Sequence, residues 1–166
     1  MGTLSQPTPS SVTVSLPKLI LRTNGEPFEV VPELPGEVLG LPVAHAAAKG
    51  IILRGDDVLL LHGDAGTWCL PGCDLSDGEE PSDAIRRGLA AMTGFPVGRA
   101  THAVSAWEAC GTEARVTHAF LCEGGHDGER HSVNPRLGWR PMGVAVAGAD
   151  GHACDMAILR TLFPYG

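Results

Sequence analysis

The stretch WCLPGCDLSDGEEPSDAIRRGLAAMTGF, residues 68–95, constrains the fold more than any other part of the chain. It predicts a helix over 81–94, because Pro81 suits the first helical turn and Gly94 suits the left-handed position that ends a helix. The apolar residues of this segment recur at helical spacing: Ala84, Ile85, Leu89 and Met92. One face of the helix is therefore expected to pack on a core.

Short β-prone runs lie on both sides of this helix. Two of them, 43–55 and 56–63, predict strands around a tight RGDD turn, and a second hairpin is expected with its turn at 111–113. Its strands and one further short strand are expected at 100–110, 114–123 and 137–142. A last helix is predicted over 153–163. The order of strands, helix, strands and helix predicts an α/β sandwich with a mixed β-sheet.

The first 41 residues differ from the rest in the prolines that interrupt their short apolar runs. Pro17, Pro32 and Pro35 interrupt the β-prone runs there, which predicts an N-terminal leader and extended arm with at most one added strand. Residues 42–166 are then expected to form the main domain, since 166 residues suffice for one buried core.

Composition excludes several classes of function. A net charge of −7 and the absence of a Lys/Arg run argue against a nucleic-acid partner, and no apolar run is long enough for a membrane span. The cysteines are odd in number and irregularly spaced, which favours reduced thiols and a cytoplasmic protein. They are Cys69, Cys73, Cys110, Cys122 and Cys154.

The spacing of residues within 68–95 resembles the signature of the Nudix superfamily, G-x5-E-x7-R-E-U-x-E-E-x-G-U, where U is aliphatic. Glu79 and Arg87 match its first glutamate and its arginine, and Gly72 and Cys73 stand where a Gly-Gly pair is usual. Leu89, Gly94 and Phe95 match the remaining frame. The resemblance extends from about Val43 to Phe163. It implies a Nudix-type α/β/α sandwich and Mg²⁺- or Mn²⁺-dependent hydrolysis of nucleoside diphosphates linked to another group.

Three positions depart from that signature. Gly88, Ala91 and Met92 stand where the resemblance places glutamates that hold the metal. Positions 88, 91 and 92 share one helix face, because residues three and four apart are neighbours on a helix. This face offers no side-chain oxygen to a hard cation. Gly88 leaves two interpretations open: close approach of a ligand or backbone, or drift after the acids lost their role.

The leading interpretation is a Nudix-fold protein with an impaired catalytic box. It binds a nucleotide-like or related small ligand, or it is repurposed for other chemistry, and no cofactor is expected. Glu79 and Arg87 are the retained catalytic positions, and they alternatively form an ion pair between loop and helix. The expected ligand pocket comprises Gly72, Cys73, Gly88, Ala91, Met92, Glu108 and Glu123. No metal ligand is assigned.

Two other functions stay open. An active hydrolase of nucleoside diphosphate-linked substrates would need Mg²⁺ or Mn²⁺ held by Glu79 and displaced side chains. The candidates are Glu108, Glu113, Glu123, His126, Asp127, Glu129 and His131. Catalysis by Cys73 is a minor variant of this idea.

The other function is a protein-interaction module, such as a homodimer, built on the apolar face and the arm. The residues His45, His102, His118, Trp107 and Trp139 are expected to pack within the fold.

Overall fold

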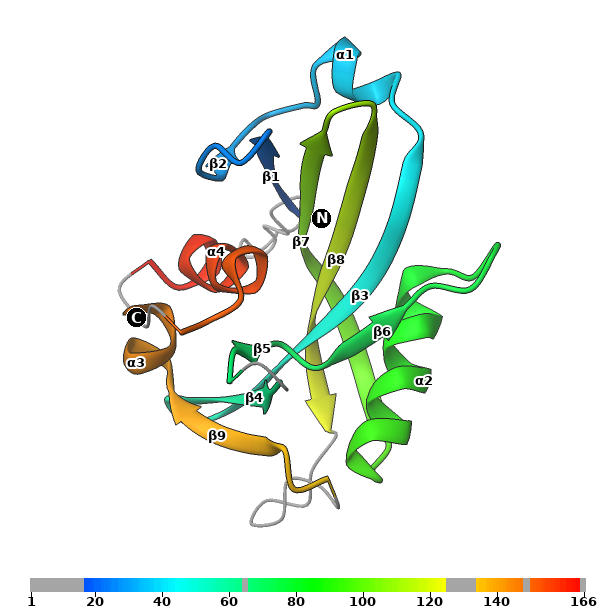
Figure 1. Cartoon of the computed structure of the whole chain (residues 1–166). Helices are drawn as coiled ribbons and strands as arrows, with labels where there is room; N and C mark the ends of the chain where they lie inside the picture. Colours follow the sequence, from blue (N-terminus) through cyan, green and yellow to red (C-terminus); the bar gives the residue numbers. More distant parts are fainter. Residues whose placement is uncertain (1–16, 64–65, 125–133, 148–149, 165–166) are drawn as a thin grey trace, which may run out of the picture.

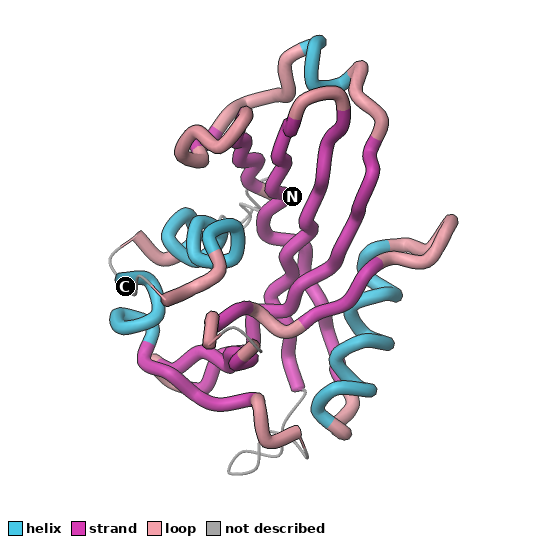
Figure 2. The backbone as a smooth tube through the Cα atoms, viewed as in Figure 1, coloured by secondary structure: helices cyan, strands magenta, loops and turns pink. Residues whose placement is uncertain are grey.

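The computed structural model describes residues 17–63, 66–124, 134–147 and 150–164, and Figures 1 and 2 show their arrangement. A twisted sheet crosses the molecule, with α2 on one face and α3 and α4 on the other. The elements are β1 (Lys18–Thr23), β2 (Glu29–Val30), α1 (Gly36–Leu39), β3 (Val43–Arg54), β4 (Asp57–His62), β5 (Trp68–Cys69), β6 (Gly72–Asp74), α2 (Pro81–Thr93), β7 (Val97–Cys110), β8 (Glu113–Gly124), β9 (Leu137–Pro141), α3 (Met142–Ala147) and α4 (Ala153–Leu162).

The sheet is mixed. Its strand order is β2-β1-β7-β8-β3-β4-β5, with β6 paired to β3 and β9 paired to β4. β1 runs parallel to β7 and β3 runs parallel to β8, whereas β7 and β8 form the expected antiparallel hairpin. The predicted α/β class with a mixed sheet is confirmed. The tight turn between β3 and β4 also lies where the sequence predicts it, with Arg54 opposite Asp57.

Helix α2 forms as the sequence predicts. Pro81 opens it, and Gly94 ends it at φ +82°, with its N–H donating to the carbonyl of Ala90. Ala84, Ile85 and Leu89 of this helix are fully buried against one face of β3 and β8. These contacts fix the orientation of the residues that bear the signature.

Helix α4 covers the opposite face. Met156, Ile158 and Leu159 are buried there, together with Ile51 of β3 and Val104 of β7. Because successive strand residues point to opposite faces, β3 contributes side chains to both helix layers.

The segment before β3 extends the sheet. β1 lies between β2 and β7, pairs along β7 from Lys18 opposite Val104 to Thr23 opposite Ala109, and buries Ile20. α1 places Val38 in a small core with Leu21 and Ala109. The boundary between 41 and 42 stays a prediction.

Several short elements are absent from the sequence-based expectation: β2, β5, β6, α1 and α3. Each has six residues or fewer, which is too short for a hydrophobic period to define. No helix in the described ranges has the length and apolar character needed to cross a membrane.

Candidate functional site

The loop before α2 is tied to the helix by the two retained signature residues. The Arg87 guanidinium donates from Nε to Oε2 of Glu79 and from Nη2 to Oε1, both at 3.0 Å. The Ser76 N–H donates to Oε1 of the same carboxylate at 2.9 Å. Arg87 also donates to the carbonyl of Asp74 at 3.4 Å. Glu79 therefore closes the loop onto the helix.

This arrangement favours the charged form of Glu79. The hydrogen bonds from Arg87 and then from the Ser76 backbone lower the pKa of Glu79 to about 2, and the carboxylate in turn raises the pKa of Arg87. Both oxygens of the Glu79 carboxylate already accept hydrogen bonds from Arg87 and Ser76, so few lone pairs remain for another partner.

Gly88 of α2 lies directly against Cys73 of β6. A Cβ atom built at Gly88 would lie 2.5 Å from Sγ of Cys73 and 2.9 Å from its Cβ. The Cys73 thiol points toward the helix and donates to the carbonyl of Ala84 at 3.1 Å. The group that lies closest to Gly88 is thus the Cys73 side chain, and not the ligand or backbone of the first interpretation.

The other two replaced positions take different environments. Met92 packs against the core beneath α2, and Ala91 is exposed. The helix face of Gly88, Ala91 and Met92 thus presents a thiol, a methyl group and a thioether where hard cations require oxygen ligands. These residues do not fit a Mg²⁺ or Mn²⁺ site.

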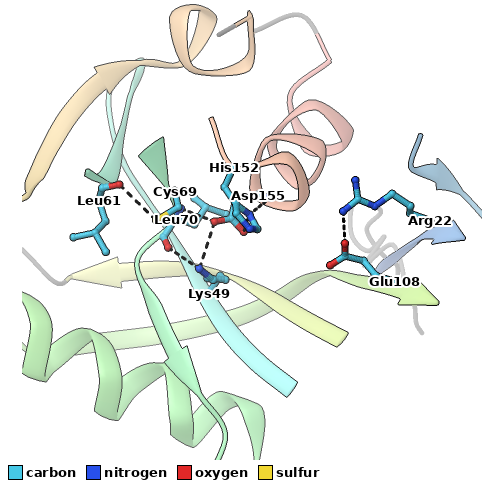
Figure 3. A network of polar contacts seen from close by, with 8 residues as sticks. All are labelled: Arg22, Lys49, Leu61, Cys69, Leu70, Glu108, His152 and Asp155. Atoms are coloured by element: carbon cyan, nitrogen blue, oxygen red, sulfur yellow. Dashed lines mark hydrogen bonds and ion pairs between the residues drawn. The ribbon is translucent and has the colours of Figure 1, made fainter. Parts of the chain in front are cut away.

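A polar cavity of about 190 Å³ lies on the opposite face of the sheet, between β3, β6, β7, β8 and α4. Its lining residues are His45, Ala47, Lys49, Gly72, Cys73, Asp74, Glu108, Arg115, Thr117, His152 and Asp155. Figure 3 shows its inner end, where Lys49 from β3 and Asp155 from α4 meet, with the Arg22–Glu108 ion pair further along the sheet.

Asp155 organises the cavity from the first turn of α4. Its side chain is fully buried, and Oδ2 accepts from the Leu70 N–H at 2.9 Å and from the Lys49 ammonium at 3.4 Å. Oδ1 accepts no hydrogen bond within the described part of the chain and lies 3.6 Å from Nδ1 of His152. Lys49 also donates to the carbonyl of Leu70 at 3.2 Å. One carboxylate therefore joins α4, β3 and the turn before β6.

Opposing effects set the protonation of this cluster. Burial raises the pKa of Asp155, but His152, Lys49 and the Leu70 N–H together bring it below its ordinary value. The same contact raises the pKa of His152, because Asp155 stabilises the imidazolium. Nδ1 of His152 also lies 3.5 Å from the Asp155 N–H, where only a neutral ring nitrogen accepts. Neutral His152 caps α4, and protonated His152 pairs with Oδ1.

Among the described residues, Arg115 is the one cationic side chain of the cavity that has no acidic partner. Asp74 pairs with His45 at 2.9 Å, Glu108 with Arg22, and Asp155 with Lys49. Arg115 forms no hydrogen bond or ion pair with any residue that the structure describes, and it is exposed at the mouth of the cavity. The site offers an anion the Arg115 guanidinium, whereas Oδ1 of Asp155 is buried beside His152.

A second cavity, about 450 Å³, continues from this one along the loop before α2. The two share His45 and Asp74, and the second extends to Glu79. A larger cavity of about 700 Å³ lies elsewhere, between α3, the β3–β4 turn and the end of α4, where Asp56 is its one ionisable residue. The polar cavity has the convergent charged groups, so it is the better candidate site.

The structure places the residues of the expected pocket in different locations. Gly72, Cys73 and Glu108 line the polar cavity, and the Cys73 thiol also reaches α2 at Gly88. Gly88, Ala91 and Met92 lie on α2, on the other face of the sheet, and Glu123 is exposed near the end of β8. Glu113 lies at the opposite end of β8 from Glu123. His126, Asp127, Glu129 and His131 lie outside the described residues.

The carboxylates proposed for a displaced metal site do not converge on Glu79. Glu108 pairs with Arg22. Glu113 and Glu123 are ten residues apart on β8, a separation of roughly 33 Å along a strand. Across the residues with assigned positions, no group of three or more His, Cys, Asp or Glu side chains is arranged to hold a metal ion.

The sequence-based reasoning missed Lys49, Arg115, His152 and Asp155. Two of them carry a signal in the sequence. Lys49 interrupts the apolar run AAAKGIIL of a buried strand, and Asp155 shares a helix face with Leu159 and Leu162. A charged residue within an apolar pattern predicts a buried pair or a site.

Of the residues expected to pack within the fold, His102, His118, Trp107 and Trp139 do so, whereas the expectation is wrong for His45, which is exposed and pairs with Asp74. Ser105 Oγ lies 2.8 Å from Nε2 of His102 and 2.8 Å from Nδ1 of His118, and burial lowers the pKa of both histidines. Trp107 and Trp139 contact hydrophobic cores. All five cysteines are free.

Comparison with known proteins identifies the fold. No known family profile and no curated protein sequence matches the chain. Among solved structures, the E. coli ORF135 protein has 17% identity and a TM-score of 0.59, over 75% of this chain and 91% of that chain. A MutT NUDIX hydrolase from Burkholderia pseudomallei has 24% identity and a TM-score of 0.53, over 69% and 95%. A NUDIX hydrolase from Nitrosomonas europaea has 18% identity and a TM-score of 0.59, over 72% and 88%. The chain has the fold of these Nudix hydrolases.

Proposed function

We propose that this protein binds a small anionic, nucleotide-like ligand in the polar cavity and does not hydrolyse it by metal-dependent Nudix chemistry. The observation that carries the proposal is the contact between Cys73 and Gly88. A side chain long enough to bring a carboxylate to position 88 meets the Cys73 sulfur, so the change at 88 is built into the packing. Replacing Gly88 by glutamate would therefore not by itself create a metal site on α2.

The state of Glu79 supports the same conclusion. Its two oxygens accept from Arg87 and Ser76, so coordination of a cation would compete with three hydrogen bonds. Diphosphate hydrolysis needs groups that offset developing negative charge and a base that orients water. The α2 face supplies neither.

Ligand binding is supported by the ion pairs of the cavity, which engage its acidic side chains and leave Arg115 without an acidic partner among the described residues. Arg115 is available to an anion, with Lys49 deeper in the same cavity. At about 190 Å³ the cavity accommodates a phosphate-sized group, and the adjoining 450 Å³ cavity provides room for the rest of a larger ligand. The exposed guanidinium of Arg115 suits the anionic group of such a ligand, because charge-assisted hydrogen bonds to phosphate are strong.

Two measurements test the proposal on the full chain. Calorimetric titration with phosphate, pyrophosphate and nucleoside mono- and diphosphates, in EDTA, is expected to give binding that weakens at least tenfold in Arg115→Ala. Arg99→Ala, on β7 and outside the cavity lining, is the matched control. Product release is then measured with Mg²⁺ and Mn²⁺ for wild type and Glu79→Gln, and no turnover is expected.

Two outcomes contradict the proposal. Stoichiometric Mn²⁺ binding together with turnover that Glu79→Gln abolishes would establish a rebuilt metal site. Failure of every anion to bind, or equal binding by the Arg115→Ala variant, would remove the assignment of the polar cavity.

A further inference from the structure

Five side chains form a row across the sheet, on the face that α4 covers. Glu108 of β7 lies opposite Arg115 of β8, and Arg115 in turn lies opposite His45 of β3. Arg22 of β1 lies opposite Glu108 at one end of the row, and Asp74 of β6 pairs with His45 at the other end. We call these residues the charged row. Arg115 occupies its centre.

Both neighbours of Arg115 in the charged row are held by partners on their far sides. Glu108 accepts a hydrogen bond from Arg22, and β1 lies on the side of β7 away from β8. Nε2 of His45 lies 2.9 Å from Oδ1 of Asp74, and β6 lies on the side of β3 away from β8. Arg115 therefore has no acidic partner among the described residues, although Glu108 lies directly opposite it.

The absence of an ion pair between Glu108 and Arg115 within the described structure requires a physical cause. Residues directly opposite on antiparallel strands have Cβ atoms roughly 4.5–5.5 Å apart, and opposite charges at such positions stabilise one another. Both side chains line the polar cavity, so they face the same space. Glu108 is therefore expected to pair with Arg115 unless another cation holds its carboxylate.

Arg22 is that cation, and two contacts fix its position. Its Nη2 donates to Oε1 of Glu108, and its guanidinium lies over the ring of Phe28, 4.6 Å from the centroid. The side chain of Glu108 is 12% exposed and that of Arg22 is 26% exposed, so water screens this pair less than a pair on the open surface. Figure 3 shows the pair apart from the cluster of Lys49 and Asp155.

We propose that Arg22 is a positioning residue of the polar cavity, which holds Glu108 toward β1 and so keeps the Arg115 guanidinium open to an anion. Arg22 acts through Glu108 and is not among the residues that line the cavity. This role rests on the proposed function, in which Arg115 binds the anionic group of the ligand. Without Arg22, the carboxylate of Glu108 pairs across the strands with Arg115 and competes with the anion.

Chemical modification of Arg115 tests this role without any ligand. Phenylglyoxal reacts with accessible guanidinium groups, and mass spectrometry of peptides from the full chain measures the rate at Arg115. The rate is expected to fall roughly two- to fivefold in Arg22→Met, which is the factor that a cross-strand ion pair supports. It is expected to return to the wild-type value in Arg22→Met/Glu108→Gln.

Arg160→Met is the matched control for the lost charge. Arg160 and Arg22 line the same neighbouring cavity, but Arg160 donates to the carbonyl of Val146. Its replacement is expected to leave the modification rate at Arg115 unchanged. Arg22→Lys is the conservative variant, and it is expected to stay close to wild type because lysine keeps a cation beside Glu108.

Anion binding supplies the second readout. In calorimetric titrations with pyrophosphate in EDTA, the affinity is expected to fall by the same factor in Arg22→Met and to recover in Arg22→Met/Glu108→Gln. An unchanged modification rate in Arg22→Met, an equal fall in Arg160→Met, or a fall that Glu108→Gln does not reverse would overturn the positioning role. A wild type that binds no anion would instead contradict the proposed function, and the modification rates would still decide whether Arg22 controls access to Arg115.

Discussion

The sulfur of Cys73 lies 2.5 Å from the position that a Cβ atom on Gly88 would occupy. One residue belongs to β6 and the other to α2, so the thiol at position 73 and the missing side chain at position 88 are one packing arrangement. The thiol fills the space over the helix that a side chain at position 88 would take.

Gly88→Ala is expected to destabilise the protein despite the helix propensity of alanine. Overpacking against Cys73 costs about 1–3 kcal/mol, and alanine regains about 1 kcal/mol of propensity. Adding Cys73→Gly removes the clash, so urea denaturation of the four proteins should give a favourable coupling of about 1 kcal/mol or more. Additive effects of the two substitutions would contradict the packing explanation.

Lys49→Met is expected to cost about 3 kcal/mol, because it leaves the buried carboxylate of Asp155 without its ammonium partner. Arg115→Met is the control, since Arg115 has no partner among the described residues and is exposed. That change should stay within about 0.5 kcal/mol. Chemical denaturation at neutral pH measures both, and equal losses would contradict the burial argument.

The Glu79–Arg87 pair should remain formed well into the acid range. The pKa of Glu79 is lowered to about 2 from an ordinary 4.5, so its contribution is complete above pH 4.5 and is lost as pH falls toward 2. The stability difference between wild type and Glu79→Gln is therefore expected to be constant from pH 8 to 5 and to shrink below 4.5. A difference that already declines near pH 6 would mean that another group dominates.

His152 should titrate above its ordinary range. Its pKa is raised through Asp155, so the imidazolium contributes stability below pH 6.5, and this contribution is lost as pH rises through the folded-state pKa. A proton NMR titration is expected to show His152 above 6.5, and Asp155→Asn should lower that pKa. His102, whose pKa burial lowers, provides an internal control in the same spectra. A His152 pKa that Asp155→Asn leaves unchanged would contradict the assignment.

Local residue chemistry was sufficient for much of the fold. Proline and glycine define both ends of α2, and apolar spacing identifies the buried faces of α2 and α4. The turn between β3 and β4 and the β7–β8 hairpin follow from runs that are contiguous in the sequence. The shared helix face of positions 88, 91 and 92 also followed at this level, because residues three and four apart are neighbours on a helix.

Only the tertiary structure decided which distant residues meet. The parallel pairing of β3 with β8 and of β1 with β7 joins segments separated by scores of residues, and no local periodicity encodes that choice. The packing of α4 on the sheet brings Lys49 of β3 to Asp155, 106 residues away, on the face opposite to Gly88, Ala91 and Met92. The sequence by itself determined that positions 88, 91 and 92 of α2 carry no acidic side chain. Packing determined that the Cys73 thiol fills the space at Gly88 and that charged groups gather in the polar cavity, because burial and strand pairing depend on the whole chain.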